Sequence, residues 1–542
     1  MFVRLCLLSL AASLVATCLA DESSAPLVGR HIDNFTLSDF RGKEHALAAY
    51  ADSELVVVAF LGAECPLVKL YAPRLEAIAQ EYGPRGVTVL GINANQQDSL
   101  TEMAAYARRH DVSFPLLKDL GNRVTDQFGA TRTPEVFVLD AERSVRYHGR
   151  IDDQYGVGYS RDEPERQDLR QAIEDLLAGR PVEIAHAPAV GCLIGRSRMP
   201  DETSDVTYSN QIARLIQKHC VECHREGEIA PFALNEYDEV AGWADMMLEV
   251  VREQRMPPWH ADPAHGEFSN ARIMTDEEKQ LLATWVENGA PKGDPADLPE
   301  PREYVTGWRL PREPDVVFAI RDKPFEVPAE GLVEYQYFAV DPKFTDDKWV
   351  SAADVVPGER SVVHHVIVFV SPPEGTKTRG IGLLAAYVPG QSSLELAPGQ
   401  ARLIPAGSKL IFQMHYTPVG TPQHDLTKLG LVFTDPETVT DEVVSLIAIN
   451  DDFEIPPHAK NHLVAASQDR WPEGARLLAV APHMHLRGKS FRVEGTWPDE
   501  RHEVLLNVPN YDFNWQNGYE FAEPIAVPKD FIAHCVAHFD NS

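Results

Sequence analysis

Apolar runs alternate with helical patterns over the first third of the chain. Residues 55–61 (LVVVAFL) and 86–93 (GVTVLGIN) are nearly continuous apolar runs, as expected of strands that are buried on both faces. Apolar residues at helical spacing follow these runs, over 67–82 and about 99–110. The pattern predicts two further strands and a helix, at 135–139, 145–151 and 168–178. An α/β domain is therefore expected over residues 21–185.

The rest of the chain divides into a helical part and a β-rich part. Residues 200–295 are rich in helical patterns, whereas from about residue 305 short β runs such as 362–370 and 409–415 are separated by Pro and Gly. Proline-rich joints near 181–190 and 291–302 mark the boundaries. We therefore expect a multidomain protein with an α/β domain, an all-α domain over 200–295 and an all-β region from 305 onward.

Composition agrees with a chain of several folded domains. A length of 542 residues suggests three or four domains at roughly 150 residues each. The formal net charge of −31 disfavours a phosphate-backbone partner, so nucleic-acid binding is not expected. Seven cysteines are too few for a disulfide scaffold in a chain of this length.

The N-terminus carries a pattern typical of secretion. Arg4 precedes an apolar run over residues 5–20 that ends in small residues before the acidic Asp21. A basic start, a short apolar core and a small residue at the cleavage point predict a signal peptide over residues 1–20. An N-terminal membrane anchor and lipidation at Cys18 are the alternatives. No later apolar stretch reaches membrane length, so the expected product is periplasmic or secreted, without a membrane span.

The middle of the chain contains a haem-attachment motif. Cys220-Val-Glu-Cys223-His224 has the spacing at which two thiols bond to the haem vinyl groups and the imidazole binds the iron. Met256 is a candidate second axial ligand, with His260 and His265 as alternatives; Met256 could instead serve core packing. A zinc-binding or disulfide-forming pair of cysteines is the other interpretation of the motif. Residues 200–295 resemble a monohaem cytochrome c, which implies covalent haem c and electron transfer.

The α/β domain carries a candidate reactive thiol. Cys65 follows the strand at 55–61 and lies at the N-terminus of the next helix, where the helix dipole favours the thiolate. The domain resembles the thioredoxin-like redoxins, and Thr133-Pro134 then corresponds to the family's cis-proline. Two departures are visible: Val68 replaces the second cysteine of a Cys-x-x-Cys pair, and Gly62 replaces the hydroxyl residue of peroxiredoxins.

A dithiol exchanger of the usual kind is therefore excluded, and a peroxidase would lack its peroxide-holding donor. Cys192 is a candidate distant resolving thiol for Cys65. The other interpretation is that both cysteines are structural or vestigial.

Histidines gather in three segments of the β-rich part. These are the adjacent pair His364 and His365, the single His415, and the pair His483 and His485. Residues two apart on a strand share a face, so His483 and His485 can hold one metal ion. His364 and His365 would point to opposite faces of a regular strand, and both can bind one ion only if the backbone bends there. Imidazole-rich sites without thiolate suit copper or zinc.

Together these segments resemble the copper type II, ascorbate-dependent monooxygenases, the group of peptidylglycine α-hydroxylating monooxygenase. The resemblance implies a double, jelly-roll-like β-sandwich over 305–445 and 446–542. It also implies one copper that receives electrons, bound by His364, His365 and His415, and a second, catalytic copper bound by His483 and His485. The histidines could instead be satisfied core or surface residues, or the fold could have lost its copper.

One ligand of the second copper in that family, a methionine, has no match here. Met484 is expected to face away from the His483 and His485 side, and His534 and His538 are the remaining candidates. Cys535 corresponds to a family cysteine whose disulfide partner is absent. The expectation is either a fragment that lacks its last strands or a site with another ligand.

The combination predicts an exported redox enzyme that hydroxylates a C–H bond of a small molecule or peptide with O₂. The haem would relay electrons from an external donor to the first copper. The alternative is an electron-transfer or thiol-redox protein whose β-sandwich is a non-catalytic binding platform. A third reading is peroxide reduction at Cys65 with electrons from the haem.

Overall fold

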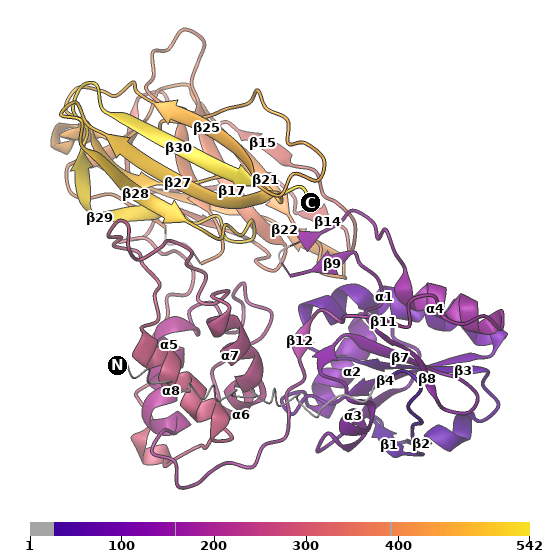
Figure 1. Cartoon of the computed structure of the whole chain (residues 1–542). Helices are drawn as coiled ribbons and strands as arrows, with labels where there is room; N and C mark the ends of the chain where they lie inside the picture. Colours follow the sequence, from indigo (N-terminus) through magenta and orange to yellow (C-terminus); the bar gives the residue numbers. More distant parts are fainter. Residues whose placement is uncertain (1–26, 158, 391–392) are drawn as a thin grey trace, which may run out of the picture.

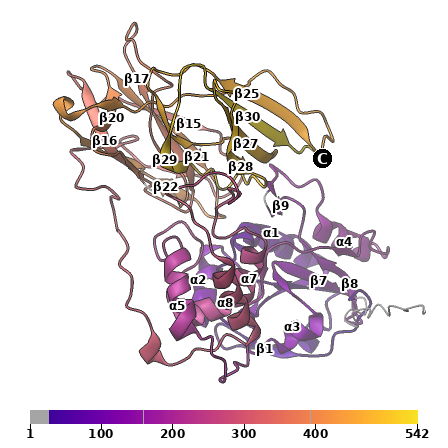
Figure 2. The same cartoon turned by 60° about the vertical axis from the view of Figure 1, so that its left-hand side comes forward.

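The computed structural model describes residues 27–157, 159–390 and 393–542. The signal peptide and the alternatives at Cys18 lie outside the described residues. Within those ranges, no helix is both long enough and apolar enough to cross a membrane. The chain forms three bodies: the α/β domain and a helical domain lie side by side, and a β-rich region lies across both (Figures 1 and 2).

The α/β domain is built on an eight-stranded sheet in the order β11-β8-β7-β3-β4-β5-β1-β2. Strands β3, β4 and β5 are parallel, β7 runs antiparallel to β3, and β8 runs antiparallel to β7. Every residue of β3 and β7 is buried, as their apolar runs predict. The strands are β1 (Thr36–Asp39), β2 (Glu44–Ala46), β3 (Leu55–Phe60), β4 (Val87–Asn93), β5 (Leu116–Lys118), β6 (Arg132–Thr133), β7 (Glu135–Leu139), β8 (Val145–Gly149), β9 (Tyr155–Gly156), β10 (Tyr159–Ser160), β11 (His186–Ala187) and β12 (Cys192–Leu193).

Helices cover both faces of this sheet. Helix α2 begins at a capping box in which the Ser99 side chain and Glu102 bond to each other's backbone. The helices are α1 (Pro66–Tyr82), α2 (Leu100–Arg109), α3 (Arg123–Phe128) and α4 (Asp168–Leu177). The sheet continues past residue 185, because β11 pairs with β8. Strand β12 forms a separate two-stranded sheet with β6.

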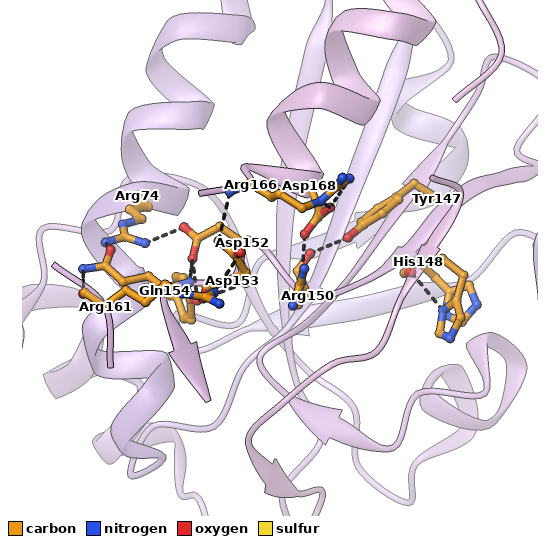
Figure 3. Close-up of polar contacts among 12 residues, drawn as sticks. Arg74, Tyr147, His148, Arg150, Asp152, Asp153, Gln154, Arg161, Arg166 and Asp168 are labelled. Carbon is orange, nitrogen blue, oxygen red and sulfur yellow. Dashed lines mark hydrogen bonds and ion pairs between the residues drawn. The ribbon is translucent and has the colours of Figure 1, made fainter. Parts of the chain in front are cut away.

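A polar network holds the segment between β8 and α4 against α1 (Figure 3). The Arg150 guanidinium donates to the Asp168 carboxylate at 2.7 Å. Asp152 accepts a hydrogen bond of 2.7 Å from the Tyr71 hydroxyl and pairs with Arg74, and both of these partners lie on α1. Because Arg150 and Asp152 come from the loop after β8, the network orders a long connection that has little secondary structure.

The helical domain follows β12 and shares a core with the α/β domain. One turn of π-helix, Tyr208–Ile212, leads into α5 (Ala213–His219), and α6 (Tyr237–Gly242), α7 (Ala244–Arg252) and α8 (Asp276–Glu287) complete it. Trp285 on α8 is fully buried. One continuous apolar cluster contains Trp285 and Met247 of this domain together with Cys65 and Cys192. The two domains therefore pack through apolar contacts as well as polar ones.

The first lobe of the β-rich region is a sandwich of two sheets. Its core lies between a six-stranded sheet around β16 and β23 and a four-stranded sheet in the order β15-β21-β17-β18. The strands are β13 (Val316–Ala319), β14 (Phe325–Val327), β15 (Gln336–Val340), β16 (Lys348–Val356), β17 (Val363–Ser371), β18 (Leu383–Tyr387), β19 (Leu394–Glu395), β20 (Gln400–Ile404), β21 (Lys409–Tyr416), β22 (Gln423–Asp425), β23 (Lys428–Phe433) and β24 (Asp441–Glu442).

The second lobe combines a four-stranded sheet, β25-β30-β27-β28, with the pair β26-β29. Its core includes Phe531, Leu506 and Tyr519, and Trp259 and Phe268 of the helical domain pack against the same core. The strands are β25 (His462–Gln468), β26 (Arg476–Val480), β27 (Gly488–Thr496), β28 (His502–Val508), β29 (Tyr519–Ala526) and β30 (Ile532–Phe539). The structure thus has an N-terminal thioredoxin-like α/β domain and a large β-rich C-terminal region.

Candidate functional sites

Cys65 lies where the sequence places it, between β3 and α1. It is the residue that precedes the first turn of α1, and its side chain is fully buried. Its sulfur lies 3.1 Å from the carbonyl oxygen of Thr133. The Thr133–Pro134 peptide bond is cis, which confirms the prediction from the Thr-Pro sequence. The cis-proline loop therefore faces the candidate thiol.

Cys192 reaches the same place from the far end of the domain. Strand β12 pairs antiparallel with β6 so that Cys192 lies opposite Thr133. Gly191 makes this approach possible: its φ is +152°, and a Cβ atom there would lie 2.0 Å from the Thr133 carbonyl oxygen. Both cysteine side chains belong to the same buried apolar cluster. The predicted association of Cys192 with Cys65 is therefore present in the fold.

The two thiols differ in acidity because each acts on the pKa of the other. Burial alone would raise the pKa of Cys65, but the hydrogen bond from Cys192 and nearby backbone N–H groups lower that pKa to about 7. The hydrogen bond to Cys65 and burial together raise the pKa of Cys192 well above its usual value. Cys65 is thus the thiolate of the pair near neutral pH, and Cys192 is the donor.

The missing hydroxyl at position 62 has a steric cause. A Cβ atom on Gly62 would lie 2.4 Å from the Asn95 amide nitrogen and 3.1 Å from the Thr133 hydroxyl. No side chain fits there unless Asn95 moves. The space beside Cys65 that a peroxiredoxin hydroxyl would fill is therefore occupied by residues of this chain.

A buried polar network below Cys65 was not anticipated from the sequence. The Asp98 carboxylate accepts hydrogen bonds from the Ala63 backbone N–H at 2.8 Å and from the amide of Asn95 at 3.1 Å. The Lys118 ammonium donates to the Asn93 side chain at 2.8 Å. The sequence feature that could have indicated this network is the group of polar residues directly after the buried strand at 86–93. This network holds the loop from Gly62 to Cys65 in place.

The Cys220–His224 motif directly follows α5. The His224 ring donates from Nδ1 to the Phe232 carbonyl oxygen at 3.2 Å, which leaves Nε2 free for a metal. Burial lowers the pKa of His224 to about 4, so the imidazole is neutral at pH 7. Cys220 and Cys223 are free cysteines in this structure. A fixed neutral imidazole beside two unpaired thiols fits covalent haem c.

The second axial ligand of a haem stays a prediction. Met256 is half-buried in the loop after α7, where its backbone N–H bonds to the Val250 carbonyl. Among the described contacts, none joins Met256, His260 or His265 to His224.

Three histidines of the first lobe form a compact cluster. The pairing of β17 with β21 has a register shift between Val363 and His365. This is the bend that the adjacent pair needs for both side chains to bind one ion. The Nδ1 atoms of His364 and His365 lie 3.2 Å apart, and one ligand atom from each of His364, His365 and His415 falls within 4.8 Å of the others. A single ion can therefore contact all three rings.

The chemistry of this cluster fits a metal ion. Within the described part of the chain, His364 Nε2, His365 Nε2 and His415 Nδ1 are buried without a hydrogen-bond partner, an arrangement that is costly unless something binds them. Burial, with the neighbouring histidines, lowers the pKa of His364 to about 3, of His365 to about 2 and of His415 to about 4. All three rings are neutral at pH 7, the state in which imidazole binds copper or zinc.

The second pair of histidines lies in a loop and not, as expected, in a strand. Residues 481–487 connect β26 to β27 without regular structure, because β26 ends at Val480. The rings of His483 and His485 still lie close together, edge to face, with centroids 5.1 Å apart. His483 also lies 6.4 Å from the His365 ring. The two predicted metal sites are thus neighbours in one space that the two lobes share.

Three further side chains join the two sets of histidines. Gln516 lies between them: its Oε1 accepts from His483 Nδ1 at 2.7 Å, and its Nε2 lies 3.5 Å from His365 Nδ1. Phe513 stacks on His364 at 5.2 Å between ring centroids, and Tyr335 stacks on His415 at 4.9 Å. No periodicity or motif marks these residues, because their positions depend on how the lobes pack.

The other candidates for the second copper lie elsewhere. Met484 is 4% exposed in an apolar cluster with Val464 and Phe539, so it faces away from the histidines as predicted. His534 and His538, on β30, bond to the hydroxyls of Ser467 and Ser490. Cys535 is a free, half-buried cysteine whose pKa is raised to about 11 by burial. Gln516 is the polar side chain that instead contacts His483.

Comparison with known proteins covers the first domain. Residues 28–148 match the AhpC/TSA family. The thiol-disulfide oxidoreductase ResA of Geobacillus thermodenitrificans is 29% identical over 125 residues, which are 23% of this chain and 70% of that protein. A chloroplastic peroxiredoxin Q of Triticum aestivum is 29% identical over 121 residues, which are 21% of this chain and 54% of that protein.

Among solved structures, a hypothetical protein from Sinorhizobium meliloti 1021 is 32% identical. The match covers 32% of this chain and 96% of that one, with a TM-score of 0.30. An uncharacterized conserved protein from Geobacillus kaustophilus is 29% identical over 31% of this chain and 90% of its own, with a TM-score of 0.29. Residues 28–148 are a thioredoxin-like redoxin domain of the AhpC/TSA family, and in this chain they precede a helical domain and a β-rich region.

Proposed function

We propose that this chain is an exported, copper-dependent monooxygenase that hydroxylates a C–H bond with O₂ and receives its electrons through a covalently bound haem c. The cluster of His364, His365 and His415 carries the proposal, because each of these three neutral imidazoles has a buried, unpartnered nitrogen and their ligand atoms lie within 4.8 Å of one another. The likeness of the redoxin domain to a thiol-disulfide oxidoreductase supports the broader assignment to the oxidoreductases.

Each set of histidines has a distinct part in the proposal. The three first-lobe histidines would hold one copper, and His483 and His485 would hold the second. Copper in such a site supplies O₂ reduction, in which one oxygen atom enters the substrate and the other leaves as water at the cost of two electrons. His483 and His485 are exposed, whereas His365 is 1% exposed, so a small molecule or peptide would approach from the second-lobe side.

Contacts between the helical domain and the second lobe support an electron relay. The side-chain amide of Asn517 donates to the Pro258 carbonyl oxygen at 2.9 Å, and Pro258 lies two residues after Met256. The neighbouring Gln516 contacts His483 and His365. Two adjacent residues thus join the loop of the proposed axial methionine to the histidines.

Metal analysis of the purified full-length chain tests the proposal. We expect about two copper ions per haem, and about one copper fewer in a His364→Ala/His365→Ala double variant, since two of three ligands are removed. His424→Ala is the matched control, because His424 is exposed on β22 of the same lobe. Chain that binds haem but no copper after loading would contradict the proposal.

The second candidate is an electron-transfer or thiol-redox protein whose β-rich region binds a partner without oxygen chemistry. The observation that favours it is the redoxin domain, in which Cys65 and Cys192 lie in one buried apolar cluster. This candidate requires no copper, and its thiol activity would survive the loss of His364 and His365. The same metal analysis therefore separates the two functions.

A further inference from the structure

Two buried cysteines from different parts of the chain meet at the boundary between the redoxin and helical domains. The family match ends at residue 148, so Cys192 lies outside the segment that the AhpC/TSA family defines. Strand β12 brings it opposite Thr133, whose carbonyl oxygen lies 3.1 Å from the Cys65 sulfur. Both side chains lie in one buried apolar cluster and each shifts the pKa of the other, so the two sulfurs share the space in which a disulfide would form.

We propose that Cys65 and Cys192 form a redox-active disulfide that exchanges with an external dithiol, with Cys192 as the sulfur that is attacked and Cys65 as the buried leaving group. This pair would stand in for the Cys-x-x-Cys motif that Val68 interrupts. The proposal concerns the thiol chemistry of the redoxin domain and does not depend on copper or haem.

The burial of the two cysteines indicates which sulfur is attacked and which sulfur leaves. Cys65 is 0% exposed, whereas Cys192 in β12 is 8% exposed. An attacking thiolate reaches the more exposed sulfur first. The sulfur that leaves should be the better stabilised thiolate, and Cys65, with its pKa lowered to about 7, is that sulfur.

The exchange balances without a further reactant. One thiolate of the external dithiol attacks the Cys192 sulfur, the S–S bond to Cys65 breaks, and Cys65 leaves as a thiolate. The second thiol of the substrate, after losing its proton to solvent, then attacks the mixed disulfide and releases Cys192, which takes up a proton. The substrate loses two electrons and becomes a disulfide, and the protein gains them as a dithiol. A disulfide substrate runs the same steps in reverse.

Arg132 supports Cys192 at this site. Its guanidinium donates to the Gly191 carbonyl at 2.8 Å and pairs with Glu249 of α7 at 2.7 Å. Its positive charge, close to Cys192, favours the thiolate of that residue. A basic side chain therefore lies beside the sulfur that must be released as a thiolate in the last step.

The test uses the purified full-length chain equilibrated in mixtures of reduced and oxidised dithiothreitol, with free thiols trapped and mapped by mass spectrometry. We expect one disulfide, between the tryptic peptides of Cys65 and Cys192, whose fraction follows the ratio of the two forms. Cys535→Ser is the matched control and should leave this disulfide unchanged. A fully reduced pair in pure oxidised dithiothreitol, or a disulfide that uses Cys535, would overturn the proposal.

Single-cysteine variants test the order of attack. With oxidised glutathione, Cys192 in Cys65→Ser should form a mixed disulfide about ten times faster than Cys65 does in Cys192→Ser, because Cys192 is the less deeply buried of the two. Equal rates, or faster capture at Cys65, would overturn the assigned order. A chelator that removes copper should change neither result, which separates this proposal from the copper-dependent function.

Discussion

Single residues decide the chemistry of the thiol pair. Cys65 is buried beside the cis-proline loop, and without the hydrogen bond from Cys192 that burial would disfavour its thiolate. Gly62 leaves room for Asn95 and Thr133 and none for a peroxide-holding hydroxyl. These residues explain why a domain that matches the AhpC/TSA family lacks one hallmark of a peroxidase.

Removal of the hydrogen-bond donor should change the acidity of Cys65. In Cys192→Ala the pKa of Cys65 should rise above about 7, because burial then acts with fewer opposing hydrogen bonds. The fraction of Cys65 thiolate at neutral pH should fall accordingly. Ultraviolet thiolate absorbance, followed against pH, measures this shift. The same titration of Cys535→Ala should resemble the wild type, and an unshifted Cys192→Ala curve would show that other groups lower the pKa.

At the scale of elements, the sequence predicts features that depend on local patterns better than features that depend on long-range strand pairing. Strands β3, β4 and β7 and helices α1 and α2 lie where the apolar pattern predicts them, because buried strands and capped helices are specified by neighbouring residues. The bulge at His364 depends on the register with β21. From the sequence we could therefore say only that both histidines can bind one ion if the backbone bends there. The loop position of His483 and His485 was missed because their spacing imitates a strand.

The same difference between local patterns and long-range packing applies to the residues of the candidate sites. Cys65, the Cys220–His224 motif and the histidines were visible as residue types at characteristic spacings. Gln516, Phe513 and Asp98 were not, since their roles arise from packing between elements far apart in the chain. Sequence patterns therefore identify groups that react, and the fold is needed to identify those that position them.

The pairing of β12 with β6 should be sensitive to one glycine. Gly191→Ala places a Cβ atom 2.0 Å from the Thr133 carbonyl oxygen, so β12 must shift away from β6. We expect a loss of about 1–3 kcal/mol in the free energy of unfolding and less of the Cys65–Cys192 disulfide in thiol mapping. Gly83→Ala is the matched control, because a Cβ atom there meets nothing within 4 Å. Equal stability of the two variants would contradict the close approach at Gly191.

At the scale of the whole molecule, one carboxylate joins two domains. Glu249 on α7 pairs at 2.7 Å with Arg132 of the cis-proline loop and at 2.7 Å with Arg255, the residue before Met256. Burial alone would raise the pKa of Glu249, but the hydrogen bond from Arg132 and the charges of both arginines lower it. The ionised carboxylate therefore links the thiol site to the loop of the proposed haem ligand.

Glu249→Gln should loosen this link. We expect the unfolding free energy above about pH 5 to fall by about 1–3 kcal/mol, because Arg132 loses its charged partner. Since the folded pKa of Glu249 is below its unfolded value, the wild-type advantage is complete above the unfolded pKa and disappears as the pH falls through the folded pKa. Thermal unfolding at several pH values measures this difference. Glu253→Gln, an exposed partner of Arg255 alone, is the control and should change little.

Strand β12 also has a consequence for how this domain could be inherited or transplanted. A gene fragment that encodes residues 28–148 carries the redoxin fold and Cys65, yet it leaves Cys192 behind. Even a cut at residue 185, between the last helix and β11, removes the second thiol. A transplanted domain would therefore be a one-cysteine protein, and any recombination event that preserves the paired thiols must also carry the first residues of the connection to the helical domain.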